Sequence, residues 1–141
     1  HEELIKLCFD KNLQVRTLIF EHLDKQWITI KKIYDLYEII YIHLKSEHPP
    51  NPSIIINEVK DSKERSLLSG LLIDVDDIGI DSMSIAIECL IRLEENFLKN
   101  KRYILRESLK SNVIENSNQI IKSITDIEAE LKNLHIKYDN K

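Results

Sequence analysis

The stretch from residue 82 to residue 110 contains neither glycine nor proline, and its apolar residues recur at every third or fourth position. This spacing predicts one long helix with two adjoining apolar rows. The first row holds Ala86, Leu90, Leu93, Phe97 and Ile104, and the second holds Ile87, Ile91, Leu98, Leu105 and Leu109. At a rise of roughly 1.5 Å per residue the helix is about 40 Å long. A small bundle needs less, so we expect this helix to project beyond the bundle.

The rest of the chain favours helices as well. Only two glycines and three prolines interrupt 141 residues, which indicates long elements. The 24 isoleucines favour strands by propensity, but they recur at helical rather than alternating positions, and periodicity is the stronger signal. We therefore predict an all-α fold, with five further helices before the long one: residues 2–9, 13–23, 30–46, 52–59 and 61–73.

Three local signals refine this prediction. Asn51 before Pro52 is typical of an N-cap followed by proline at the first helical position. Asp61 followed by Glu64 resembles a capping box. Trp27, in a segment that breaks the helical pattern, is expected to be a large plug between elements.

A last helix is predicted after the segment "SNVIENSNQ", where Asn116 and Gln119 are expected to cap it. Its apolar residues follow a spacing of four, three, four, three and four, which favours one antiparallel partner helix. These residues, the seam of a C-terminal helical hairpin, are Ile120, Ile124, Ile127, Leu131, Leu134 and Tyr138. The predicted organisation is a helical bundle at 1–81, a connecting helix at 82–110 and a hairpin at 111–141.

The totals exclude several classes of protein. The net charge of −4 gives no general attraction to nucleic acid, although residues 1–81 carry a net charge of −5 and residues 82–141 a net charge of +1. No apolar run approaches the roughly 20 residues of a membrane span, so we expect no contact with a membrane. Cys8 and Cys89 are interpreted as buried free thiols of a reducing compartment, which indicates a cytoplasmic protein.

Catalytic and metal-binding motifs are missing. The chain has no phosphate-binding glycine loop, no nucleophile elbow, and no paired histidines or cysteines at the spacing of a metal site. Asp74, Asp76 and Gly79 fit a calcium loop, but Ile78 and Ile85 occupy two of its ligand positions. We therefore expect a solvated acidic loop, no cofactor in this chain, and no enzymatic activity.

Two surfaces remain as candidate sites. The first is a basic stripe on the long helix, formed by Arg92, Lys99, Arg102, Arg106 and Lys110. One interpretation is a solvated face with nearby glutamates as partial partners; the other is a contact for phosphates or for an acidic protein. Tyr103 is the only aromatic residue that interleaves with the stripe, which argues against base stacking.

The second surface is the hairpin. Two paired helices have one seam, so apolar residues off that seam are left over: Val113, Ile114, Ile121 and Ile136. Tyr138 is expected to close the open end of the seam, where its ring also reaches a partner. The leftover surface is covered either by the bundle or by a helical partner, and the sequence leaves both open.

The order of these segments resembles the C-terminal helicase-binding domain of bacterial primases. The resemblance rests on "EELIKLCFDKNLQVRTLIFEHL", "KQWIT" and "IYDLYEIIYIHL", then on a proline break before "PSIIINEVKDSKERSLLSGLL", and finally on "AIECLIRLEENFLKNKRYILRESLK" with a second helix after it. It covers essentially the whole chain and rests on element order, the "CLIRL" opening and the terminal hairpin. The turn departs from the family, whose turns are richer in alanine and arginine.

The resemblance implies a function. The chain begins at His1 rather than methionine, and we interpret it as a piece of a longer protein. The parent would be a primase with a zinc-binding domain and a magnesium-dependent polymerase domain upstream. In the family, the bundle stimulates the replicative DNA helicase, and the hairpin anchors primase to the helicase's N-terminal collar. The hairpin would therefore supply the helicase contacts, at Val113, Ile114, Ile121, Ile136 and Tyr138.

Two alternatives stay open at this point. The N-terminal domain of the replicative helicase has a similar helical fold. A helical nucleic-acid-binding domain would use the basic stripe, although direct binding of nucleic acid is not expected from the charge balance.

Overall fold

The computed structural model describes residues 1–46, 48–72, 81–110 and 117–139, and it confirms the all-α prediction. In these residues we find seven α-helices, two short 3-10 helices and no β-strand. The chain forms two compact units, His1–Leu90 and Ile91–Lys141. The division falls inside the long helix, whereas the sequence placed boundaries at its two ends. Val113, Ile114, Asn116 and the acidic loop with Asp74, Asp76 and Gly79 lie outside the described residues.

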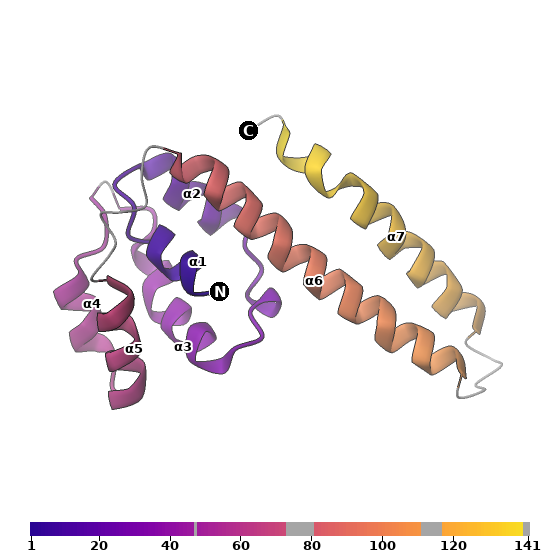
Figure 1. Ribbon diagram of the computed structural model, residues 1–141, viewed down its shortest axis with the longest axis horizontal. Helices are drawn as coiled ribbons and strands as arrows, with labels where there is room; N and C mark the ends of the chain where they lie inside the picture. The colour runs from indigo at the N-terminus through magenta and orange to yellow at the C-terminus, as the bar shows by residue number, and fades with distance from the viewer. Residues whose placement is uncertain (47, 73–80, 111–116, 140–141) are drawn as a thin grey trace. The chain divides into compact units, whose positions relative to one another are not determined.

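The first unit is the bundle. It contains α1 (Glu2–Leu7), α2 (Leu13–His22), η1 (Lys25–Trp27), α3 (Lys31–Ile40), η2 (Tyr41–His43), α4 (Pro52–Glu58), α5 (Ser62–Leu72) and the first turns of α6 (Ser82–Lys110). Helix α1 packs against α3 and α5, and α4 packs against both α3 and α5 (Figure 1). The core is aliphatic, and its fully buried side chains include Leu4, Ile5, Ile19, Ile33, Leu36, Ile40, Ile55, Leu68 and Leu90.

The local signals are mostly confirmed. The Asn51 side chain accepts a hydrogen bond from the Ser53 amide at 2.9 Å, with proline at the first helical position. Asp61 Oδ1 accepts from the amides of Glu64 at 3.1 Å and Lys63 at 2.8 Å, and these hydrogen bonds lower the pKa of Asp61. Trp27 is buried, as expected of a plug.

The third helix was predicted too long. Helix α3 covers Lys31–Ile40, and the chain then tightens into a 3-10 turn instead of continuing to Ser46. The segment after this turn is held by a side chain of α2: Arg16 Nη2 donates a hydrogen bond to the Ser46 carbonyl at 2.8 Å. Ile30, predicted as the first residue of this helix, is instead its N-cap, with an extended backbone and a side chain that is 47% exposed.

Arg16 lies in the bundle with no exposed surface. Its Nη1 donates to the Asp10 carbonyl at 3.1 Å, so one guanidinium binds the loop before α2 and the segment after η2. Burial lowers the pKa of Arg16. The two carbonyls are partners that a buried cation requires, since an unpaired charge in a core is strongly unfavourable.

The two cysteines are buried free thiols in the bundle, as predicted. Burial raises the pKa of the Cys8 thiol, and the nearby Cys89 contributes in the same direction. A raised thiol pKa keeps the reactive thiolate scarce.

Replacing Asn51 by alanine should lower the free energy of unfolding by about 1 kcal/mol, since the Ser53 amide loses its cap. Asn57→Ala is the matched control, because Asn57 is exposed and lies in the last turn of the same helix, away from the cap. Alanine is the better helix former there, so this variant should be as stable as the parent or slightly more stable. Urea unfolding followed by circular dichroism measures both. Equal stability of the two variants would contradict a capping role for Asn51.

Candidate interaction surface

The second unit is a two-helix hairpin, in which α7 (Ser117–Asp139) runs antiparallel to the second part of α6 (Figure 1). Among the residues that the structure describes, two ion pairs join the helices. Lys137 Nζ lies 3.1 and 3.2 Å from the two carboxylate oxygens of Glu94, and Arg106 Nη2 lies 3.0 Å from Glu128 Oε1. These pairs define which residues of the two helices lie at the same level.

The seam of the hairpin follows the predicted spacing. On α7, the seam residues Ile127, Leu134 and Tyr138 are buried, and Ile120, Ile124 and Leu131 are half-buried. On α6, Leu98 is buried while Leu105 and Leu109 are half-buried. The register set by the ion pairs places Leu98 level with Leu134.

Tyr138 belongs to the seam. Only 3% of its surface is exposed, and the expectation that its ring also reaches a partner stays a prediction. Burial raises the pKa of Tyr138 to about 12, and the Glu94 carboxylate contributes in the same direction. Lys137 Nζ lies 5.6 Å from the ring centroid, within the range of a cation–π contact. Tyr138 therefore stabilises the open end of the hairpin.

Two isoleucines face outward on α7. Ile121 is 52% exposed and Ile136 is 60% exposed, as expected for residues that lie off the seam. The rest of the hairpin unit leaves both side chains uncovered, so they are available to a partner. Val113 and Ile114, which were assigned to the same surface, lie outside the described residues.

The basic stripe is largely neutralised within the hairpin unit. Three of its five cations lie beside carboxylates: Lys99 at 2.7 Å from Glu95, Lys110 at 3.1 Å from Glu107, and Arg106 at 3.0 Å from Glu128. The Lys99 pair lowers the pKa of Glu95. Each such exposed pair contributes only about 0–1 kcal/mol to stability. The arrangement matches the interpretation of a solvated face with glutamate partners.

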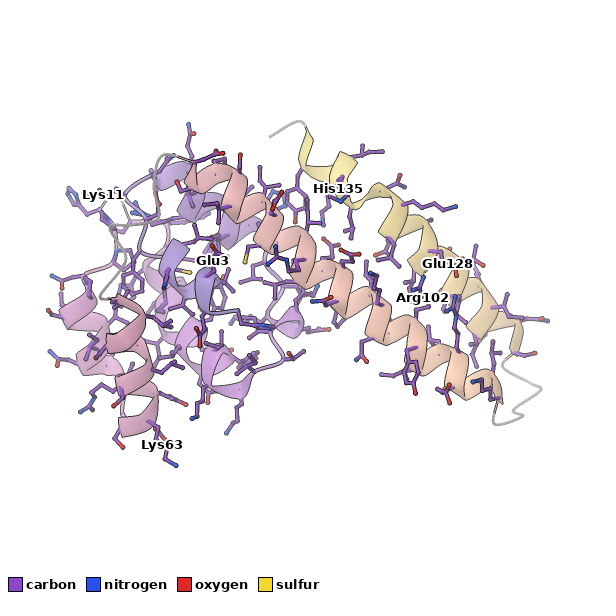
Figure 2. The ribbon with its side chains drawn as sticks, in the orientation of Figure 1. Glu3, Lys11, Lys63, Arg102, Glu128 and His135 are labelled. Atoms are coloured by element: carbon purple, nitrogen blue, oxygen red, sulfur yellow. The ribbon has the colours of Figure 1, made fainter. Side chains whose placement is uncertain are left out.

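The fourth cation of the stripe lies beside the seam. Arg102 lines a groove of about 330 Å³ whose other walls are Glu95, Lys99, Glu128, Leu131 and Lys132. Figure 2 shows Arg102 on α6 and Glu128 on α7, with His135 farther along α7. The groove mixes both signs of charge, which suits a polar partner surface better than a phosphate backbone.

Sequence reasoning missed four residues of this unit. Glu94 is only 8% exposed and pairs with Lys137, and neither residue was singled out from the sequence. A signal was present, because Glu94 lies between Ile91 and Leu98 on an apolar row. Tyr103 and Ile104 were not assigned to the exposed apolar surface, yet they are 63% and 55% exposed.

Ile104 continues the first apolar row, but it is not buried as the earlier residues of that row are. Ala86 and Leu90 of that row are buried in the bundle, whereas Ile104 lies in the hairpin unit. There α7 covers the Leu98 side of the helix, and Ile104 is turned well away from Leu98 at roughly 100° per residue. The apolar row thus extends to residues that no other helix covers in the described structure.

A double-mutant cycle with Glu94→Gln and Lys137→Met should give a coupling energy of about 1–2 kcal/mol. This value lies between those of exposed and buried pairs, because the Glu94 side chain is 10% exposed and the Lys137 side chain 43%. The control cycle is Glu128→Gln with Arg106→Met, whose side chains are 44% and 53% exposed. It should give less than about 1 kcal/mol. Equal coupling energies in both cycles would show that the burial of Glu94 does not strengthen its ion pair.

Alkaline pH should destabilise the parent more than a Tyr138→Phe variant. The raised pKa means that the folded chain holds the Tyr138 proton more tightly than the unfolded chain does. This contribution is fully present below the unfolded pKa of about 10 and is lost as the pH rises through about 12. Helicity and tyrosinate absorbance, followed from pH 9 to 12, test this. Because the variant keeps every other tyrosine and lysine, a difference between the two curves isolates Tyr138, and identical curves would refute the assignment.

Comparisons with protein-family models, with curated proteins and with solved structures found no match for this chain. The resemblance to a primase helicase-binding domain therefore stays a prediction.

Proposed function

We propose that this chain is a protein-interaction module of a primase, which binds the replicative DNA helicase through the outer face of its hairpin. The observation that carries the proposal is the exposure of Ile121 and Ile136 on α7, on the side away from the seam. The choice of the helicase as the partner rests on the segment order, which resembles that of primase helicase-binding domains.

The hairpin is suited to such a contact because its own fold leaves these side chains uncovered. One helix pair buries one stripe on each helix, and Ile121 and Ile136 belong to neither stripe. Fully burying an isoleucine contributes about 1.5–3 kcal/mol. Covering two half-exposed ones is therefore worth roughly 2–3 kcal/mol, which is a substantial part of a micromolar contact.

The charges favour a protein partner over nucleic acid. Three cations of the basic stripe already lie beside carboxylates, and the groove with Arg102 contains Glu95 and Glu128. A helical partner with an apolar patch and a mixed polar rim matches this surface. In this role the module recruits primase to the replication fork and modulates the helicase.

The Ile121→Ser, Ile136→Ser double variant should bind the replicative helicase of the same organism at least about tenfold more weakly than the parent, because two apolar contacts are lost. The seam stays intact, so helicity and the unfolding midpoint should change little. Binding is measured by isothermal titration with the full chain.

Ile54→Ser is the matched control. Ile54 is 54% exposed, like the hairpin isoleucines, but it lies on α4 in the bundle. Parent-like binding of the double variant would refute the proposed contact. An equal loss in the Ile54 variant would show that general surface hydrophobicity, rather than the hairpin face, controls binding.

A further inference from the structure

The exposed face of α7 has an internal symmetry. Five residues on this face, which we call the outer row, are all exposed: Ile121, Thr125, Ala129, Lys132 and Ile136. At about 100° per residue they fall within one arc, roughly 130° around the helix from the centre of the seam. The row has an isoleucine at each end, a polar residue next to each isoleucine, and the small Ala129 at its centre.

The outer row reads nearly the same in both directions. When two α7 helices lie antiparallel, with a two-fold axis between Glu128 and Ala129, Ile121 of one copy lies level with Ile136 of the other. Thr125 then lies level with Lys132. The two isoleucines of one helix are about 22 Å apart at roughly 1.5 Å per residue, and both meet an isoleucine at once. A two-fold interface requires this kind of self-complementary surface.

The charges fit the antiparallel arrangement. Lys132 of each copy comes within one helical turn of Glu128 of the other, which gives two equivalent ion pairs. The two Glu128 side chains approach each other near the axis, but Arg106 of the same chain lies 3.0 Å from each. A parallel arrangement would instead place Lys132 against Lys132. Ala129 at the centre allows the helices to approach closely.

From this pattern we propose that the outer row is a self-association surface and that a second copy of this chain binds to it in antiparallel orientation. The proposal concerns this chain alone and does not depend on the helicase. If both proposals hold, the second copy and the helicase compete for Ile121 and Ile136, so self-association covers the partner surface until the helicase displaces it. The interface is small, so we expect a dissociation constant of roughly 0.1–1 mM.

Cysteine cross-linking tests the register. Full-length Ile121→Cys and Ile136→Cys variants are mixed and treated with a mild oxidant, the disulfide form of glutathione. The native Cys8 and Cys89 are buried and stay protected in the folded chain. A disulfide-linked dimer should form at least about tenfold faster in the mixture than in either variant alone, because each cysteine is level with the other residue and not with its own twin.

The matched control is a mixture of Asp126→Cys and Glu130→Cys. These residues are exposed and lie within one residue of the same level across this axis, but they are on the wrong side of α7. Sedimentation equilibrium of the unaltered chain should show a concentration-dependent dimer, which Ile136→Ser and Lys132→Glu each weaken at least about tenfold. A chain that stays monomeric to about 1 mM, or a control mixture that cross-links as fast as the test mixture, overturns the inference. Helicase binding that persists in a strictly monomeric chain would leave the proposed function standing.

Discussion

The hairpin depends on charge to fix its register. Apart from Tyr138 at its open end, the seam consists of leucines and isoleucines, which are nearly interchangeable in a two-helix contact. A shift of α7 by seven residues would set Leu98 against Ile127, and the hydrophobic burial would hardly change. The same shift would set Glu94 against Glu130 in place of Lys137. A buried carboxylate would then lose its cation and face a like charge, so this alternative is disfavoured.

A fixed register determines which side chains remain outside. One seam cannot cover the whole surface of two amphipathic helices, and α7 leaves Ile121 and Ile136 exposed while α6 leaves Tyr103 and Ile104. A larger bundle would bury such residues against a third or fourth helix. In the hairpin they stay available, which is why both proposals concern the same unit. The bundle has a filled core and exposed aliphatic side chains of its own, at Leu13, Ile30, Ile42 and Ile54. Among the described residues, its buried cation Arg16 donates to two backbone carbonyls.

Helix positions and caps could be predicted from the sequence because they depend on local chemistry. Asn51 needs only the next two amides to act as a cap, and the seam of α7 needs only its own spacing. The failures involve residues whose role depends on distant parts of the chain. Ile104 continues a genuine apolar row, and only the position of α7 shows that the row has lost its cover. In the sequence, Arg16 and Glu94 cannot be told from surface charges. Their partners are distant in the chain: Ser46 for Arg16 and Lys137 for Glu94. The helicase is proposed from the order of the segments, because no contact within the chain identifies a partner.

The two interhelical ion pairs also differ in the length of chain that each closes. Arg106 and Glu128 are 22 residues apart, while Glu94 and Lys137 are 43 apart. Doubling the length of a loop costs only about 0.6 kcal/mol of additional closure entropy. If the Arg106–Glu128 pair forms first, forming the Glu94–Lys137 pair therefore adds only a small entropic cost. Fraying runs in the opposite order and begins at the open end. Among the described residues, the most buried ion pair of the unit therefore lies at the end where the hairpin would otherwise open first. Together with the buried Tyr138, it should slow amide hydrogen exchange in the last turns of α7.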